Sequence, residues 1–336
     1  MSSDTTTGSP TDSATGATTA ITTAPGSRVG AGPGSAARGV PPPRWRAAVT
    51  WRPARIPGGR RTWVLPVCAG TLLALLGFAL IVPWVADVDP RLTDLAAANQ
   101  GPSAAHWFGT DQSGRDLLVR VAQGMRVSLL IAILCAVVAT VLGCLIGLAA
   151  AAFGGWVDRV LMRAVDALNA IPHLLLGIVI ASMWKGAILA VIASIALTHW
   201  TQVARIVRSE ALTVRTRDYV LAAVSLGGTR WRVMADHLLP AVAPQALLAI
   251  ALLLPHAVWH ESALSFLGVG LPPDRPSLGT LLEDARTRIL IGQWWMLLFP
   301  ALALVVATAA TAGLSAVARD RMLPHRHTEL GIGGVR

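Results

Sequence analysis

The chain is poor in the residues on which most soluble enzymes depend. Charged side chains make up 14% of its 336 residues, there is one tyrosine, and Lys185 is the only lysine. A phosphate-binding Walker loop needs a Gly-Lys pair followed by serine or threonine. Lys185 follows a tryptophan and precedes Gly186, so the chain has no such loop. It also has no HExxH or GxSxG motif. These absences argue against an enzyme, and against hydrolysis of ATP by this chain.

Cysteine is also scarce. Cys68, Cys135 and Cys144 all lie inside apolar runs, and their spacing is not that of a zinc site. We therefore expect them to act as small packing residues. The sequence predicts no catalytic residue, no metal site and no cofactor.

Long uncharged apolar runs are what the chain has in abundance. Hydrophobic residues make up 54% of the sequence, and runs of roughly 18 or more apolar residues are typical of membrane helices. The pattern predicts an all-α membrane protein with about six transmembrane helices, at residues 63–85, 127–153, 164–184, 186–204, 238–266 and 289–318. We expect one transmembrane domain over residues 63–323.

Residues 1–62 differ from the rest in composition. They are rich in Ser, Thr, Gly, Ala and Pro and then in Arg, with too few large apolar side chains to bury a core. We expect a disordered, basic tail here and a second tail at residues 324–336. The basic and aromatic residues just before the first apolar run suit either a membrane-surface segment that contacts lipid or a plain linker.

Basic residues are unevenly distributed among the segments between the runs. The net charge is +10, and the arginines flank the apolar runs, which favours a role in membrane orientation over nucleic-acid binding. With the N-terminus inside, 20 of the 28 basic residues fall on the cytoplasmic side and 8 outside. The sequence thus predicts a multi-pass protein of the bacterial cell membrane with both termini cytoplasmic.

The longest internal cytoplasmic segment covers residues 204–240. From Asp218 to Gly227 it reads as a short helix, and Gly227 is a plausible stop. A second helical piece leads to Pro240, where the next run begins. A short helix on the cytoplasmic side is a natural contact for a soluble partner.

This segment resembles the EAA loop of the permeases of ABC importers. The family triplet corresponds to Leu221, Ala222 and Ala223, Gly227 follows four residues later, and the closing Leu-Pro is present at Pro240. Two positions depart from the pattern: the usual Glu is Leu221, and the usual Ile is His237. The missing Glu puts one polar contact to the ATPase in doubt.

Two further segments narrow the resemblance. GTDQSGRD at 109–116, followed by Arg120 and by GMRVSL at 124–129, is similar to the signature ahead of the second span in C-type permeases of dipeptide, oligopeptide and nickel importers. ESALSFLGVGLPPDRPSLGTLLEDA at 261–285 resembles the segment after their fifth span. Taken alone, GTDQSGRD would be read as a turn. Its signature residues are Gly109, Thr110, Asp111, Gly114, Arg115 and Asp116.

The resemblance implies a type I importer permease that forms a pore with a B-type permease subunit. ATPase subunits would dock on the cytoplasmic loop, and the residues implied in coupling are Asp218, Leu221, Ala222, Ala223, Gly227 and Pro240. An extracytoplasmic solute-binding protein would deliver di- or oligopeptides, with nickel or a nickel chelate as the alternative. An ion-gradient transporter is a rival of a different class, which charges confined to span ends disfavour.

Ionisable residues within the runs are candidates for the transport pathway. His256 and His260 are four residues apart on one helix face, directly before Glu261. They suggest a substrate-facing or metal-passing group, or else histidines satisfied by helix neighbours. Glu261 could equally be a solvated charge at a helix end, and Asp166 a partner of Arg163 at helical spacing.

Overall fold

A computed structural model describes residues 61–86, 93–272 and 275–322 of the chain. These residues are almost entirely helical, and the only strand pairing among them is an isolated antiparallel bridge between Thr110 and Asp116. The tails expected at 1–62 and 324–336 lie almost wholly outside the described residues.

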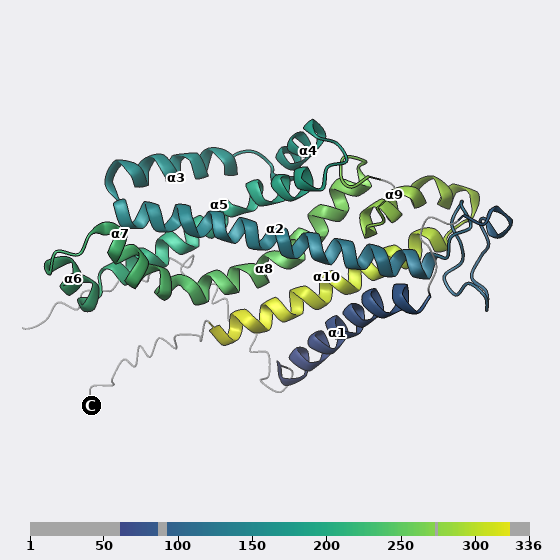
Figure 1. Cartoon of the computed structure of the whole chain (residues 1–336), viewed down its shortest axis with the longest axis horizontal. Helices are drawn as coiled ribbons and strands as arrows, with labels where there is room; N and C mark the ends of the chain where they lie inside the picture. Colours follow the sequence, from purple (N-terminus) through teal and green to yellow (C-terminus); the bar gives the residue numbers. More distant parts are fainter. Residues whose placement is uncertain (1–60, 87–92, 273–274, 323–336) are drawn as a thin grey trace, which may run out of the picture. The chain divides into compact units, whose positions relative to one another are not determined.

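Five helices are long and apolar enough to cross a membrane in the described part of the chain (Figure 1). They are α1 (Arg61–Val85), α2 (Leu117–Phe153), α5 (Ile188–Arg215), α8 (Leu239–Phe266) and α10 (Trp295–Met322). A sixth crossing is possible if α3 (Gly155–Asn169) and α4 (His173–Met183) are counted together. The helical membrane fold and its five to six spans agree with the sequence prediction.

The shorter elements connect these helices. A 3-10 turn, η3 (Leu95–Ala97), precedes α2. The segment predicted to be the cytoplasmic loop follows α5 and consists of α6 (Asp218–Ser225), α7 (Arg230–Val233) and the π-helical turn η4 (Met234–Leu238). Between α8 and α10 lie α9 (Leu278–Arg288) and the 3-10 turn η5 (Ile289–Ile291).

Helix α2 is the centre of the bundle and packs against α5 and α8. Its contact with α5 depends on glycines, because a Cβ on Gly143 would lie 2.5 Å from the Cβ of Val203, and one on Gly147 would lie 2.6 Å from the Ala204 carbonyl oxygen. Small residues of this kind allow close approach of helices in membranes. The rigid α2–α5 pair therefore links the two ends of the bundle.

The two ends carry different features. Helices α6 and α7 lie at one end, where α2 and α5 finish, while α9 and the segment before α2 lie at the opposite end (Figure 1). α9 packs on α2, α8 and α10 at that end. The segment that follows α5 and the two signature segments are thus separated by the length of the bundle.

The helices differ in their bounds from four of the predicted spans, and α5 continues to Arg215, eleven residues past the end predicted at 204. The third span is broken: α3 and α4 meet at 89° across Ala170–Pro172, because proline excludes the preceding residue from the helical conformation. The second helix begins ten residues earlier than predicted, at Leu117, since Asp116 caps it by accepting a hydrogen bond from the Leu118 N–H. The last begins at Trp295, because Gly292 adopts a left-handed conformation after η5.

Candidate functional site

Helix α6 is the predicted coupling helix, and the structure forms it over Asp218–Ser225. Val220 is fully buried against the main core, whereas Tyr219, Leu221, Val224 and Leu226 are exposed. Leu226 is 89% exposed and Leu221 51%. One side of α6 is therefore anchored in the protein, and the other presents large apolar side chains at the end of the bundle.

A glycine pair ends α6 in a Schellman motif. The Gly228 N–H donates to the Ala223 carbonyl at 3.0 Å, and the Gly227 N–H donates to the Val224 carbonyl at 3.0 Å. Gly227 has φ +87°, a conformation that glycine adopts readily. This explains physically why glycine at 227 follows the helix, as the sequence pattern predicted. Pro240 follows directly on the π-helical turn η4, within a helical stretch that continues from Arg230 to Phe266.

Two arginines of this region hold the end of α2. Arg215, the last residue of α5, donates to the Ala151 carbonyl at 2.9 Å, and Arg230, the first of α7, donates to the Phe153 carbonyl at 2.8 Å. They satisfy carbonyls that the last turn of a helix leaves unpaired, and they complement its dipole. Trp231 adds an edge contact to the Phe153 ring. Sequence reasoning did not identify either arginine, because each partner carbonyl is more than sixty residues away along the chain.

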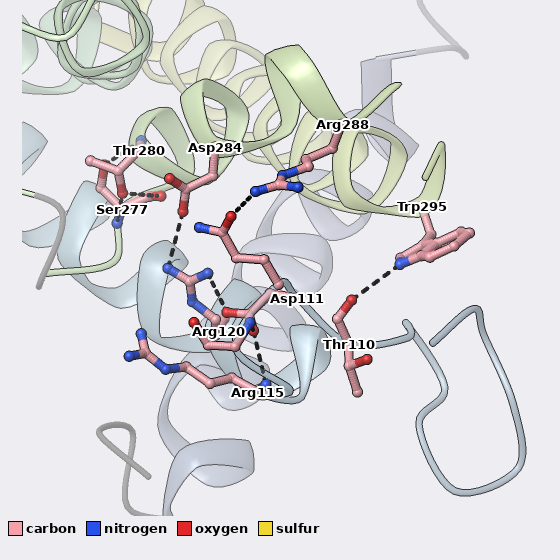
Figure 2. A network of polar contacts seen from close by, with 11 residues as sticks. Thr110, Asp111, Arg115, Arg120, Ser277, Thr280, Asp284, Arg288 and Trp295 are labelled. Atoms are coloured by element: carbon pink, nitrogen blue, oxygen red, sulfur yellow. Dashed lines mark hydrogen bonds and ion pairs between the residues drawn. The ribbon is translucent and has the colours of Figure 1, made fainter. Parts of the chain in front are cut away.

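The signature residues 109–116 form an ion-pair network at the opposite end (Figure 2). Asp111 is buried; one carboxylate oxygen accepts from the N–H groups of Ser113 and Arg115, and the other accepts from Arg120 at 2.7 Å. Arg120 also contacts Asp284 of α9 at 3.3 Å. The segment is thus both the turn that its composition predicted and an anchor between α2 and α9.

Two glycines of the same segment cannot carry a side chain. Gly114 has φ +73°, and a Cβ there would meet the Asp94 carbonyl oxygen at 1.7 Å. Gly109 has φ +78° and lies against Trp295, whose indole N–H donates to the Thr110 carbonyl at 3.3 Å. Arg288 donates to the side chain of Gln112. Figure 2 shows how these contacts join the segment to α9 and to the start of α10.

Glu261 is not a solvated helix-end charge. Its side chain is completely buried and accepts hydrogen bonds from Ser128 of α2 at 2.7 Å and from Ser265 at 3.0 Å, with a longer one from Ser262 at 3.4 Å. Ser128 in turn accepts from the Leu278 N–H, at the start of α9. The reading of Glu261 as solvated is wrong, because α9 folds back over the end of α8 and covers it.

His256 and His260 do not lie with Glu261 but with two histidines that sequence reasoning did not connect to them. The His199 ring on α5 is 4.7 Å from that of His260 and 5.7 Å from that of His173, at the start of α4. His199 is buried, His260 half-buried and His256 exposed. No set of three His, Cys, Asp or Glu side chains in the described residues is arranged to hold a metal ion.

Helix α3 is joined to α5 by polar contacts. Asp166 pairs with Arg205 at 2.7 Å and not with Arg163, which corrects the pairing expected from helical spacing. Asp158 forms a two-pronged pair with Arg208 at 2.5 and 2.6 Å. Spacing along α3 predicted Arg163 as the partner of Asp166. The packing of α3 against α5 instead brings the Arg205 guanidinium into contact with this carboxylate.

Comparison with known proteins identifies the family. Residues 139–323 match the binding-protein-dependent transport system inner membrane component family. A putative peptide transport system permease protein of Brucella suis biovar 1 (strain 1330) is 36% identical over 258 residues, which cover 77% of this chain and 86% of that protein. The dipeptide transport system permease protein DppC of Bacillus subtilis (strain 168) is 35% identical over 230 residues, covering 68% and 72%. The chain therefore belongs to the binding-protein-dependent transport system inner membrane components, the permease subunits of ABC importers.

Membership confirms several of the sequence predictions. The chain is a multi-pass membrane protein and a transport subunit, not itself an enzyme. The family implies an ATPase and a binding protein as partners. The rival reading of an ion-gradient transporter is thereby set aside.

Proposed function

We propose that the chain is the C-type permease subunit of an ATP-driven importer of di- and oligopeptides. The names of its relatives favour peptides, since several are called peptide or dipeptide permeases. The chain would pair with a B-type permease subunit to enclose the pathway, and an extracytoplasmic binding protein would deliver the peptide.

The exposed apolar face of α6 is the observation that carries the coupling role. Leu221, Val224 and Leu226 project at the end of the bundle while Val220 fixes the helix to the core. An apolar helix face of this kind suits a groove on a soluble partner. The partner would be the ATPase, and Leu221 would replace the polar contact of the usual Glu by an apolar one.

Motion of the docked ATPase would reach the pathway through α2. Arg215 and Arg230 tie the coupling region to the carbonyls that end α2, and Gly143 and Gly147 lock α2 against α5. A displacement of α6 would therefore move α2 and α5 together as a rigid body. ATP binding would switch the helices toward the outward-facing state, and hydrolysis would reset them.

The arginine distribution supports an orientation with both termini, and α6, in the cytoplasm. The segment 109–116 and α9 would then lie outside, on the side of the binding protein. A reporter that is active only in the cytoplasm, fused after Arg336, tests this orientation. Activity supports it, and an inactive but full-length fusion contradicts it.

The function is tested by purifying the chain from gently solubilised membranes and identifying the proteins that accompany it. Recovery of a second permease, an ATPase and a solute-binding protein supports the importer. The recovered binding protein is then titrated with dipeptides and with nickel, because nickel is the alternative cargo. Binding of nickel without peptide would replace the peptide assignment and leave the importer assignment intact.

A further inference from the structure

Three helices bring four histidines to one place within the membrane region. His173 begins α4, His199 lies on α5, and His256 and His260 lie on α8; the three helices contact one another. The rings of His173, His199 and His260 form a continuous series with centroid separations of 5.7 and 4.7 Å. His256 lies one turn from His260 and interacts electrostatically with both His199 and His260. We call these four residues the histidine cluster.

The cluster lies on helices of the membrane domain. His199 follows the start of α5, which is long and apolar enough to cross a membrane, by eleven residues, or about 16 Å along the helix. His173 lies directly after the break between α3 and α4. Ionisable side chains within such helices are functional candidates, and a broken helix beside them is typical of transport sites.

His199 is held through its Nδ1, which lies 2.9 Å from the Ile195 carbonyl oxygen and 2.9 Å from the Thr198 hydroxyl oxygen. The neutral ring has one N–H and one lone pair, and protonation makes both nitrogens donors. Protonation thus changes what His199 offers to a ligand, from one donor and one acceptor to two charged donors.

The two sides of the break between α3 and α4 each carry a buried polar atom without a partner in the described residues. The Asn169 side-chain oxygen accepts from Thr201 at 2.8 Å, but its buried Nδ2 has no partner in the described residues. The buried Nδ1 of His173 also has none there. A buried amide donor without an acceptor is costly, and a ligand oxygen would relieve that cost.

The cluster lacks an acidic partner among the described residues, whose only histidine–carboxylate pair is His106 with Asp116. The neighbouring acids are already engaged: Glu261 by serines on the α2 side, and Asp166 by Arg205. Cys135 of α2 lines the same small apolar gap as His199. A protonated imidazole in this cluster has no carboxylate partner among the described residues, so an incoming anion would stabilise it.

We propose that the histidine cluster and Asn169 bind the terminal carboxylate of a peptide during its passage, and do so with uptake of a proton. This rests on the proposed function as a peptide permease. Asn169 donates through its free amide, and a protonated imidazole supplies the charge and further donors. A carboxylate and an imidazolium attract each other strongly at a buried site because little water screens them.

The test uses the membrane complex purified through this chain, without its binding protein, in lipid nanodiscs. Binding of tritiated Ala-Ala is measured at about pH 5.5 and about pH 7.5, on either side of the ordinary histidine titration. We expect binding at least about fivefold tighter at the acidic pH, with no competition by Ala-Ala amide. Equal binding at the two pH values, equal competition by the amide, absent binding, or tighter binding at the alkaline pH would overturn the proposal.

Substitutions within and outside the histidine cluster test whether the pH dependence of binding comes from the cluster. The double substitution His199→Gln with His260→Gln should abolish the pH dependence, and His256→Gln, at an exposed position that tolerates change, should reduce it. His106→Gln, the same substitution outside the cluster, should leave the pH dependence unchanged. Persistence of the wild-type profile in H256Q and in the double variant, both recovered with the ATPase, would refute the assignment.

A second readout distinguishes this proposal from the proposed function. ATP-driven import of Ala-Ala is followed in vesicles that hold the complete importer with its binding protein. Import without histidine-dependent binding would overturn the carboxylate site and leave the peptide permease standing. No import of any peptide by the intact importer would overturn the function itself.

Discussion

Arg230, the first residue of α7, donates a hydrogen bond to the carbonyl of Phe153, the residue that ends α2, at 2.8 Å. The two residues are 77 positions apart in the sequence. Through this contact and that of Arg215 with Ala151, the segment around α6 and α7 holds the central helix of the bundle.

Replacing Arg230 by alanine should weaken transport more than assembly. The variant loses a charge-assisted hydrogen bond worth about 1.5–3 kcal/mol at the junction between α7 and α2. We expect the ATPase to remain bound while peptide import per ATP hydrolysed falls several-fold. Arg230→Lys keeps the charge, so its peptide import per ATP hydrolysed should lie between those of the wild type and R230A. An R230A importer with unchanged coupling ratio would show that the junction does not transmit motion.

Ala223→Glu should produce a permease that assembles but does not import. Ala223 is half-buried, and its carbonyl closes the turn with Gly228, so a longer charged side chain would project into the docking region. Ala223→Ser, a small uncharged change at the same position, is the matched control. Peptide uptake and co-purification of the ATPase are measured for both variants. Normal uptake by A223E counts against docking on this surface.

Gly114→Ala should prevent the segment 109–116 from folding. A Cβ there would lie 1.7 Å from the Asp94 carbonyl oxygen, and the left-handed conformation at φ +73° adds strain. Gly70→Ala in α1 meets nothing within 4 Å and should be neutral or slightly stabilising. Thermal melting of the two purified variants tests the difference. Equal melting temperatures would contradict the close approach.

Arg120→Met should destabilise the protein by about 3–5 kcal/mol, because it leaves the buried Asp111 carboxylate without its cation. The double variant Asp111→Asn with Arg120→Met should recover part of this loss, since no unpaired charge remains. Unfolding in denaturant measures the free energies of the two variants. If R120M is no less stable than the wild type, the ion pair does not anchor α2 to α9.

Glu261→Ala should destabilise the outer end of the bundle by about 2–4 kcal/mol. It opens a cavity and leaves the hydroxyl groups of Ser128 and Ser265 without their acceptor. Glu261→Gln keeps one oxygen and the volume, and should lose less. Thermal melting is the readout. A stable E261A protein with impaired import would instead indicate that Glu261 acts in the pathway.

The secondary-structure elements that depend only on residues adjacent in the sequence could be predicted from the sequence. Asp218 lies in the first turn of a short helix, and Gly227 ends it in the left-handed conformation. Long apolar runs identify spans because backbone groups in lipid must be paired internally. The sequence motifs also indicated the family, which the comparisons confirmed.

Other features depended on residues far apart along the chain. The burial of Glu261 depends on the return of α9 across α8, and the pairing of Asp166 with Arg205 depends on how α3 lies on α5. Neither follows from spacing on a single helix, which describes only the nearest neighbours.

The sequence by itself determined that this chain is a helical membrane permease and predicted a short helix from Asp218 to Gly227, because composition, motifs and turn chemistry are local properties. Only the tertiary structure decided which distant groups meet: Arg230 with the end of α2, Arg120 with Asp111 and Asp284, and the four histidines of α4, α5 and α8. Such contacts arise when helices pack, and close packing through small residues such as Gly143 selects partners that no single segment specifies.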